Sequence, residues 1–559
     1  MLTVFVTYSY FLGLRTLDVI DNTVELINED RKESKQIDSS DIPLNDPKVY
    51  KFLSTGHTSG VFQFESPGMT NLLKRMFNDV RVREDNAKKG EEYFERLIAA
   101  VSLYRPGPMD EINNFIKAMK TGNVHYDHKK LESILGNTYG ILVYQEQIMF
   151  AVRELAGFTA GQADSIRKAM GKKKTEIMDE YGEYFIHGSE KYDKEHPNSP
   201  KNIKGCVKNG IPEETAKLIW DKMVKFAAYA FNKSHATCYA AIGMRTAWLS
   251  CYYPVEFMTG MLNSFIGKAD KIKQYVNACK ARKIEVLQPD INESGLRFSL
   301  LKTKQENGRY KKSIRFGLSG IVNVGDVATK AIIKERETHG EYKDMLDFLK
   351  RAARIKIDRR VLEPLIATGA FDKFGYTRKT LLSNIEYMYK ILESARNENQ
   401  NQLTMFDFFN EEQYQLTFEN ISEYTKAEMG IKEMEFLGLM IHHPVIEYKE
   451  KLDKWKSAGK LQDIEETLDS LSLDEEKEVR FAGLVMDKEL KTSIKNNKTN
   501  KYLTFMLDDG VSTVKCIAFK QNALQFDAMI KPNSMVYLLG FAKYDDFGKS
   551  VIVNKILAL

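Results

Sequence analysis

The spacing of apolar residues changes once along this 559-residue chain, and that change limits its possible folds more than any other feature. From about residue 85 to 290, apolar residues mostly recur every three to four positions, the period of an amphipathic helix. From about 478 to 559, they alternate with polar residues in five short runs separated by turns. Such evenly spaced runs are typical of a small β-barrel. The predicted fold is therefore multidomain and mainly α, with a C-terminal β-barrel.

The length and the punctuation of the chain support several domains. A typical size of about 150 residues per domain predicts roughly three to five. The segment "VFQFES" alternates like a strand and follows the turn-rich "STGHTSG". Farther along, "LSGIVNVG" and "ATGAFDKFG" are small-residue turns between short helices, and an Asn-, Gln- and Glu-rich stretch from 391 to 430 reads as a connector with one apolar island.

Composition excludes several classes of protein. The 82 Lys and Arg residues nearly balance the 77 Asp and Glu residues, so a nucleic-acid argument must depend on where the cations cluster. The five cysteines form no CxxC pair, which argues against a disulfide framework or a zinc site and fits a reducing cytosol. We expect a cytoplasmic protein with no signal peptide and no membrane span.

A first cluster of cations lies at the end of the segment "FTAGQADSIRKAMGKKK". Thr159 and Gln162 have the spacing of a capping box, so a helix should begin there and end at Gly171. Cations at a helix C-terminus can simply complement its dipole in solvent, or they can hold a polyphosphate or nucleic-acid backbone, which would offset their repulsion. The spacing alone leaves both readings open. The cations are Arg167, Lys168, Lys172, Lys173 and Lys174.

A second cluster lies in "FNKSHATCYA", where Lys233, Ser234 and His235 begin an almost wholly apolar helix predicted from about 235 to 253. The helix before it should end near Asn232, which makes Ser234 the predicted N-cap. The three polar residues either cap and solubilise a buried helix or, with the free N–H groups of its first turn, form a phosphate seat. In the second reading, they are tolerated there because a ligand anion satisfies them.

Eight segments together resemble the alpha subunit of bacterial DNA polymerase III, a C-family replicative polymerase. They occur in the family's order and cover nearly the whole chain after residue 10, so the resemblance is specific. The segments are "FLGLRTLDVI", "GVFQFESPGM", "LIAAVSLYRPGPM", "YGILVYQEQIM", "GFTAGQADSIRKAMGKKK", "FAAYAFNKSHATCYA", "LQPDINES" and "EFLGLMIHHP".

The resemblance implies a function for each part of the chain. Fingers of this family close on the incoming deoxynucleoside triphosphate, so both cation clusters and an arginine of "YRPGPM" are implied to line the nucleotide and template pocket. The implied nucleotide-binding residues are Arg105, Arg167, Lys168, Lys172, Lys173, Lys174, Lys233, Ser234 and His235. The implied domains are a palm remnant and lead-in (1–58), fingers (59–290), tandem helix-hairpin-helix (291–390), connector with a clamp-binding peptide (391–430), linker (431–477) and OB-like barrel (478–559).

Three further contacts follow. The turn of "FGLSGIVNVGDVATKAI" resembles a helix-hairpin-helix, which grips phosphate through its amides, although an ordinary helical turn is the alternative. "LIATGAFDKFG" would be the paired hairpin. "QLTMF" resembles the peptide that holds the β sliding clamp, and the barrel loop "KNNKTNKY" suits backbone attraction with base stacking. The implied residues are Gly320, Ile321, Val324 and Gly325 for DNA, Gln402, Leu403, Met405 and Phe406 for the clamp, and Lys498, Lys501 and Tyr502 for DNA.

The catalytic carboxylates are the exception. The resemblance implies a DNA-directed DNA polymerase (nucleotidyltransferase) that uses Mg²⁺ held by palm aspartates. Two of these belong to a segment N-terminal to anything in this sequence, and Tyr10 stands where the third is expected. We therefore expect a C-terminal portion of the subunit that lacks most of the palm, with no catalytic residue or metal ligand of its own, and inactive in isolation. It serves either as the nucleotide-, DNA- and clamp-binding part of a polymerase with other replicase subunits, or as a non-catalytic DNA- and clamp-binding remnant.

Overall fold

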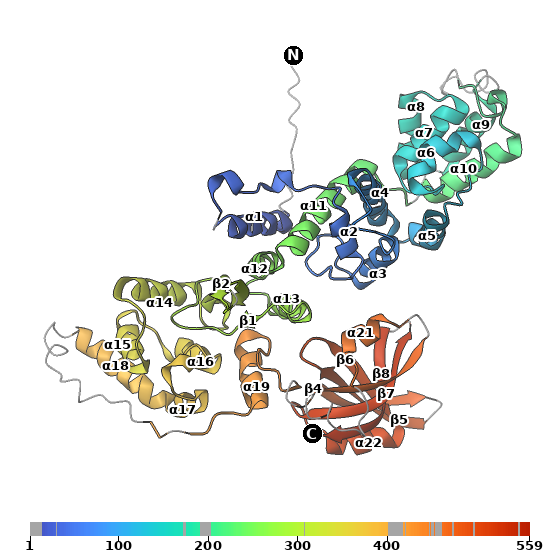
Figure 1. The fold of residues 1–559 in the computed structure, drawn as a ribbon. Coiled ribbons are helices and arrows are strands. Elements are labelled where there is room, and N and C mark those ends of the chain that lie inside the picture. The colour runs from blue at the N-terminus through green and yellow to red at the C-terminus, as the bar shows by residue number, and fades with distance from the viewer. Residues whose placement is uncertain are drawn as a thin grey trace, which may run out of the picture. The chain divides into compact units, whose positions relative to one another are not determined.

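The region where apolar residues recur with a helical period is mostly helical in the structure, as predicted. The structure, a computed structural model (Figure 1), describes residues 14–29, 31–171, 175–189, 203–227, 229–306, 308–400, 418–419, 421–445, 448, 452, 461–471, 475–495, 498–545 and 548–559. It divides into two units, Met1–Phe257 and Met258–Leu559. The helices of the first unit are α1 (Arg15–Asn28), α2 (Pro47–Leu53), α3 (Pro67–Met76), α4 (Ala87–Leu103), α5 (Ile112–Thr121), α6 (Glu132–Leu135), α7 (Gln145–Ala156), α8 (Ala160–Gly171), α9 (Thr175–His187), α10 (Glu213–Ala227) and α11 (Lys233–Tyr252), while α12 (Pro254–Ser264) crosses the boundary.

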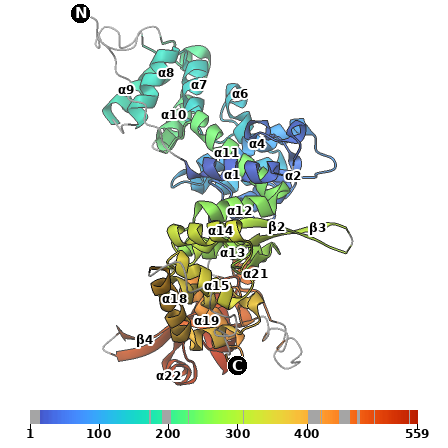
Figure 2. The same ribbon diagram turned by 90° about the vertical axis from the view of Figure 1, so that its left-hand side faces the viewer.

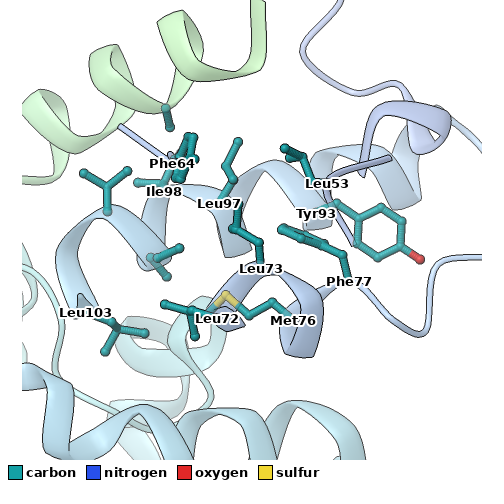
Figure 3. Close-up of a cluster of buried hydrophobic side chains, with 14 of the residues drawn as sticks. Leu53, Phe64, Leu72, Leu73, Met76, Phe77, Tyr93, Leu97, Ile98 and Leu103 are labelled. Atoms are coloured by element: carbon teal, nitrogen blue, oxygen red, sulfur yellow. The ribbon is translucent and has the colours of Figure 1, made fainter. Parts of the chain in front are cut away.

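Two apolar clusters hold the first unit together. Figure 3 shows part of the first, in which leucines and aromatic rings of α2, α3 and α4 interlock. Ala236, Ala240 and Met244 of α11 complete this cluster. The second cluster joins α7, α8, α9 and α10, around residues such as Phe185 and Trp220, whose ring centroids lie 5.3 Å apart.

The predicted strand "VFQFES" is wrong. Residues 61–66 form consecutive turns, in which the N–H of Val61 donates to the carbonyl of Thr58 and the N–H of Phe64 donates to that of Val61. Gln63 takes a left-handed conformation with φ of 67°. The apolar alternation has another cause, because these turns direct Val61 and Phe64 into the first apolar cluster, where both are fully buried.

The second unit contains helices, a small sheet and a barrel. Its helices are α13 (Ala269–Ala281), α14 (Asp326–His339), α15 (Met345–Arg354), α16 (Arg359–Ala367), α17 (Arg378–Ser383), α18 (Ile385–Gln400), α19 (Lys426–Leu437), α21 (Ile464–Asp469) and α22 (Lys520–Met529). Its strands are β1 (Val286–Leu287), β2 (Ser299–Lys304), β3 (Tyr310–Arg315), β4 (Glu476–Lys495), β5 (Lys498–Asp508), β6 (Thr513–Phe519), β7 (Met535–Asp545) and β8 (Gly548–Ala558). The sheet β1-β3-β2 was not predicted. The predicted connector 391–430 is partly helical, because α18 extends to Gln400 and α19 begins at Lys426.

The C-terminal strands confirm the period-2 prediction. Strand pairing follows the order β4-β5-β6-β8-β7, and β7 pairs back with β4 to form the barrel. Along β6, exposed and buried side chains alternate, as expected when one face of a strand lines a core. Helix α22, which the sequence reading did not predict, follows β6 directly, and Ala523 and Phe526 face the barrel core.

Candidate functional site

The helix that begins in the "FNKSH" segment is α11, and it starts at Lys233. Its N-cap is Asn232, whose side-chain oxygen accepts a hydrogen bond from the N–H of His235 at 2.9 Å. The prediction of Ser234 as the N-cap is therefore wrong, because Asn232 already has the extended backbone and the short acceptor side chain that this position requires. The preceding helix, α10, ends at Ala227, five residues earlier than predicted.

Carboxylates of the protein itself already occupy this helix N-terminus. Glu146, in the first turn of α7, accepts hydrogen bonds from the N–H of Lys233 at 2.9 Å and from the side-chain amide of Asn232 at 2.8 Å. The Lys233 ammonium forms an ion pair with Glu95 of α4 at 2.9 Å. Asn232, Lys233 and the N–H of His235 are therefore paired within the protein. A ligand anion is not needed to explain why these polar groups begin a buried helix. Ser234 and His235 remain exposed.

A column of neighbouring aromatic rings, with the Arg105 guanidinium at one end, lies beside this N-terminus. The Arg105 guanidinium carbon lies 4.0 Å from the centre of the Phe231 ring. The centres of the Phe231 and His235 rings are 5.4 Å apart, and those of His235 and Tyr239 are 4.3 Å apart. Phe62 extends the column, with its ring centre 5.3 Å from that of Tyr239. Arg105 and His235 are exposed, so a cationic and an aromatic side chain of the column face solvent.

Sequence reasoning placed Arg105 near "FNKSH" but missed the aromatic partners. Phe231, His235 and Tyr239 are spaced four residues apart, the interval that aligns side chains on one face of a helix. That spacing was the available signal. Glu95 and Glu146 carried no such signal, because their pairing with Lys233 depends on how α4 and α7 pack against α11.

The cations of α8 are partly paired. The predicted capping box is confirmed, since the N–H of Thr159 donates to Gln162 at 2.8 Å and the N–H of Gln162 donates back to the Thr159 hydroxyl at 3.3 Å. Arg167 and Lys168 both form ion pairs with Asp164 at 2.8 Å. Hydrogen bonds from Lys168 and then Arg167 lower the pKa of the Asp164 carboxyl. Lys172, Lys173 and Lys174 lie outside the described residues.

The first predicted hairpin forms a turn between a 3-10 helix, Leu318–Gly320, and α14. Ile321 and Val324 are 2% and 1% exposed, so their side chains hold the turn in the core and cannot themselves contact DNA. Gly325 differs, because a Cβ atom there would meet nothing within 4 Å. Its backbone can therefore be approached from outside. At Gly320, by contrast, a Cβ atom would lie 2.8 Å from the Phe316 ring, so internal packing explains that glycine.

The second predicted hairpin has its turn packed inward. Gly369, with φ of 86°, lies so close to Arg378 that a Cβ atom would come within 2.2 Å of the guanidinium. Arg378 is 2% exposed and pairs with Asp372 and Glu433. This turn is therefore held by a buried ion-pair network.

The barrel residues are only partly described. Tyr502 lies opposite Phe519 in the β5–β6 register, with ring centres 6.3 Å apart, and Phe519 is 47% exposed. Lys501 is exposed beside them, whereas the side chain of Lys498 lies outside the described residues. The clamp-type peptide, Gln402, Leu403, Met405 and Phe406, also lies outside them.

The described part of the chain contains neither a cluster of metal-ligating side chains nor a helix that could span a membrane. Within those residues, no three His, Cys, Asp or Glu side chains gather in a way that could hold a metal ion. None of the described helices combines the length and the hydropathy needed to cross a membrane.

Family models match three separate parts of the chain. A family model described as the bacterial DNA polymerase III alpha subunit finger domain matches residues 16–193. A helix-hairpin-helix model matches residues 283–381, and a model of an OB-fold nucleic acid binding domain matches 479–559. The DNA polymerase III subunit alpha of Bacillus subtilis is 34% identical over 95% of this chain and 43% of its own length. That of Campylobacter jejuni is 36% identical over 95% of this chain and 41% of its own length.

The chain belongs to the family of bacterial DNA polymerase III alpha subunits. It spans about two fifths of the length of these relatives. The resemblance that the eight segments indicated is thus confirmed, as is the fold class, with helical fingers and helix-hairpin-helix regions followed by an OB-type barrel. Nucleic-acid-binding domains of two kinds fit a protein that contacts DNA.

Proposed function

We propose that this chain is the part of a replicative DNA polymerase III alpha subunit that binds the incoming nucleotide, the DNA and the sliding clamp during template-directed DNA synthesis in the cytoplasm. The observation that carries the proposal is the column of Arg105, Phe231, His235 and Tyr239, in which Arg105 and His235 are exposed and the other two are half-buried. A guanidinium and an imidazole beside aromatic rings suit a ligand that combines a planar base with a polyphosphate.

In this proposal, the triphosphate contacts the exposed cations around the column. Arg105 and His235 both contact the Phe231 ring. Ser234 is exposed in the first turn of α11, next to His235. Arg167 and Lys168, with the neighbouring Lys172, Lys173 and Lys174, would add charge from the end of α8. Lys233 has a different position, since its ammonium already pairs with Glu95 and would have to share that partner.

Arg105 gives the direct test of the nucleotide site. Arg105→Ala removes both the charge and the plane over Phe231, whereas Arg105→Lys keeps the charge alone. We expect Arg105→Ala to weaken the binding of a fluorescent deoxynucleoside triphosphate about tenfold or more, a loss of roughly 1.5–3 kcal/mol for a charge-assisted contact, with Arg105→Lys in between. Equal affinity in all three proteins would refute the site.

The lysines after α8 give a second test. Replacing Lys172, Lys173 and Lys174 with Ala should weaken nucleotide or DNA binding and flatten its salt dependence.

Magnesium does not fit the described residues. Glu146 and Glu95, the carboxylates that contact the start of α11, are both engaged with Lys233, and Asp164 is engaged with Arg167 and Lys168. We propose that the Mg²⁺ ions used by polymerases of this kind are held by residues other than these. The described chain would then bind and orient the nucleotide and the DNA, and we expect it to be inactive alone.

DNA would be held at two places and the clamp at a third. The turn before α14 would receive a phosphate at the open backbone of Gly325. In the barrel, Lys501 would attract the backbone while Tyr502 stacks on bases. The peptide with Leu403 and Phe406 would hold the β sliding clamp, and Leu403→Ala with Phe406→Ala should abolish clamp capture without changing DNA binding. Loss of both activities together would indicate misfolding instead.

Primer extension tests the whole proposal. The purified chain, with primer–template, Mg²⁺ and deoxynucleoside triphosphates, should extend nothing, and adding an alpha-subunit fragment that carries the palm should restore extension. Extension by the chain alone would refute the reasoning about the carboxylates. Binding to DNA and clamp without any restoration would favour the second candidate, a non-catalytic remnant, which Tyr10 at an expected aspartate position supports.

A further inference from the structure

The hairpin β2–β3 is a charged element to which no role has been assigned above. Figure 2 shows it as a two-stranded ribbon that extends away from the neighbouring helix α14. Each strand has six residues, so the ribbon is about 20 Å long at 3.3–3.4 Å per residue. Side chains at its root, such as Ile314, are buried, and those toward its tip are exposed.

The root of the ribbon is firmly held. β1 pairs with β3 in parallel, and Arg315, which is 8% exposed, donates to the carbonyl oxygen of Gln288 at 2.8 Å and pairs with Glu293. Because its base is fixed by these contacts, the ribbon holds the side chains of its outer part in a defined geometry.

Charge is concentrated on this ribbon. Residues 299–315 contain six cations and one acid, a net charge of +5 that equals the net charge of the whole 559-residue chain. The cations are Lys302, Lys304, Arg309, Lys311, Lys312 and Arg315, and the acid is Glu306. Such an excess makes the ribbon a local attractor of polyanions.

The strand register sorts these residues between two faces. Lys302 lies directly opposite Lys312, and Lys304 lies opposite Tyr310, so these four side chains share one face. Tyr310 is 62% exposed. The other face carries Thr303 opposite Lys311, and Lys311 forms an ion pair with Glu285 at 2.8 Å.

Like charges directly opposite each other on neighbouring strands lower the stability of a sheet. Lys302 and Lys312 form such a pair, and a polyanion on this face would add negative charge to the contacts that both lysines already make. Phosphates spaced along a strand would meet the three lysines, and an exposed tyrosine at the end of the face offers a surface on which an unpaired base can stack.

We propose that the face of the β2–β3 ribbon formed by Lys302, Lys304, Lys312 and Tyr310 binds single-stranded DNA, with phosphates at the lysines and a base stacked on Tyr310. This contact is additional to the turn at Gly325 and to the barrel, and it rests on the proposed function only in that the chain binds DNA. Duplex DNA fits the face less well, because its bases are not available for stacking.

Lys311 and Lys312 provide a matched pair of variants. They are adjacent and both exposed, but they point to opposite faces of the ribbon. With the full chain and an oligothymidylate of about 20 nucleotides, longer than the ~4–16 that one OB fold covers, Lys312→Gln should raise the Kd severalfold, whereas Lys311→Gln should not. Lys302→Gln, Lys304→Gln and Lys312→Gln together should lower the salt slope by about 2, at ~0.7 per phosphate contact on a single strand.

Tyr310 tests the stacking directly. Tyr310→Leu should weaken binding about tenfold, and Tyr310→Phe should leave it unchanged, because every base can stack on an aromatic ring. Photo-crosslinking with iodouracil-substituted single strands, followed by mass spectrometry, should mark Tyr310. A blunt duplex should show neither effect.

The outcomes separate this proposal from the general one. If the wild-type chain binds DNA but the ribbon variants bind equally well and Tyr310 is not cross-linked, the ribbon proposal fails while DNA binding stands. If the wild-type chain binds no DNA, both fail. Lys302→Gln with Lys312→Gln keeps two long polar side chains at the same register positions, so its melting temperature should stay close to that of the wild-type chain. A lower melting temperature together with lost binding would mean that the ribbon had unfolded, and would overturn the face-specific contact.

Discussion

Glu433 of α19 is fully buried and joins three separate parts of the second unit. One carboxylate oxygen accepts from the Arg378 guanidinium at 3.0 Å and lies 2.6 Å from Nδ1 of His442. The other accepts from the backbone N–H groups of Ile441 and His442, both at 2.8 Å. Burial alone would raise the pKa of this carboxyl, but the hydrogen bond and charge of His442, with the charge of Arg378, hold it below its ordinary value. We predict that Glu433→Gln will loosen this junction.

The magnitude follows from the contacts. The substitution keeps the shape but removes the charge, and its amide group must face donors, at either the backbone pair or the Arg378 side. Breaking a buried ion pair by removing one partner costs about 3–5 kcal/mol. A buried donor left without an acceptor costs about 1–3 kcal/mol, which is part of the same loss rather than an addition to it. We expect a local destabilisation of about 4 kcal/mol, or roughly 1,000-fold in an opening equilibrium.

Hydrogen exchange is the appropriate assay, because a chain with two units need not unfold in one step. The amides of Ile441 and His442 donate directly to Glu433 and should lose most of their protection in Glu433→Gln. Glu435→Gln is the matched control, since it makes the same change at an exposed position of the same helix. Protection should be unchanged there.

Two results would refute the reasoning. One is a loss of protection below about threefold at both amides, which would correspond to less than about 1 kcal/mol. The other is strict additivity with Arg378→Met, because two residues of one buried network should couple by about 0.5–3 kcal/mol. The double variant should therefore cost less than the two single variants together.

The remaining predictions concern a buried histidine and a helix glycine. Burial, partly opposed by Asp508, lowers the pKa of His443 to about 4 from 6.5, so the folded state resists its protonation. The contribution of this residue to stability should therefore be largest above pH 6.5 and should fall by about 3 kcal/mol as the pH drops toward 4. In thermal melts, the melting temperature of His443→Gln should depend less on pH over this range than that of the wild-type chain. An equal pH dependence in both proteins would contradict the prediction. Gly243→Ala should destabilise α11, because its Cβ would lie 2.3 Å from the Phe64 ring, whereas Gly161→Ala in α8, with open space around it, should stabilise by about 0.4–1 kcal/mol in the same melts.

Local signals in the sequence predicted much of the fold. The capping box of Thr159 and Gln162 places the start of α8, and the period-2 runs give the barrel strands. These features depend on residues a few positions apart, so they can be recognised without the rest of the chain. The ribbon β2–β3 was missed because its outer halves are rich in lysine and lack an apolar alternation, although its root is buried.

The candidate site was predicted less completely. Arg105, Ser234 and His235 are exposed and suit a ligand, but the sequence gave no sign that Glu95 and Glu146 satisfy Lys233. It also could not distinguish Gly325, whose backbone is open, from Ile321 and Val324, whose side chains hold the turn from inside.

By itself, the sequence determined the family, the helical first part of the chain, the barrel strands and both ends of α8, because each depends on neighbouring residues or on motifs read in order. Only the tertiary structure decided which charges are paired, which rings stack beside Arg105, and which face of the β2–β3 ribbon carries Lys312 rather than Lys311. The physical reason is that Coulomb attraction, stacking and burial depend on distances between side chains. Those distances are set by how helices and strands far apart in the sequence pack together.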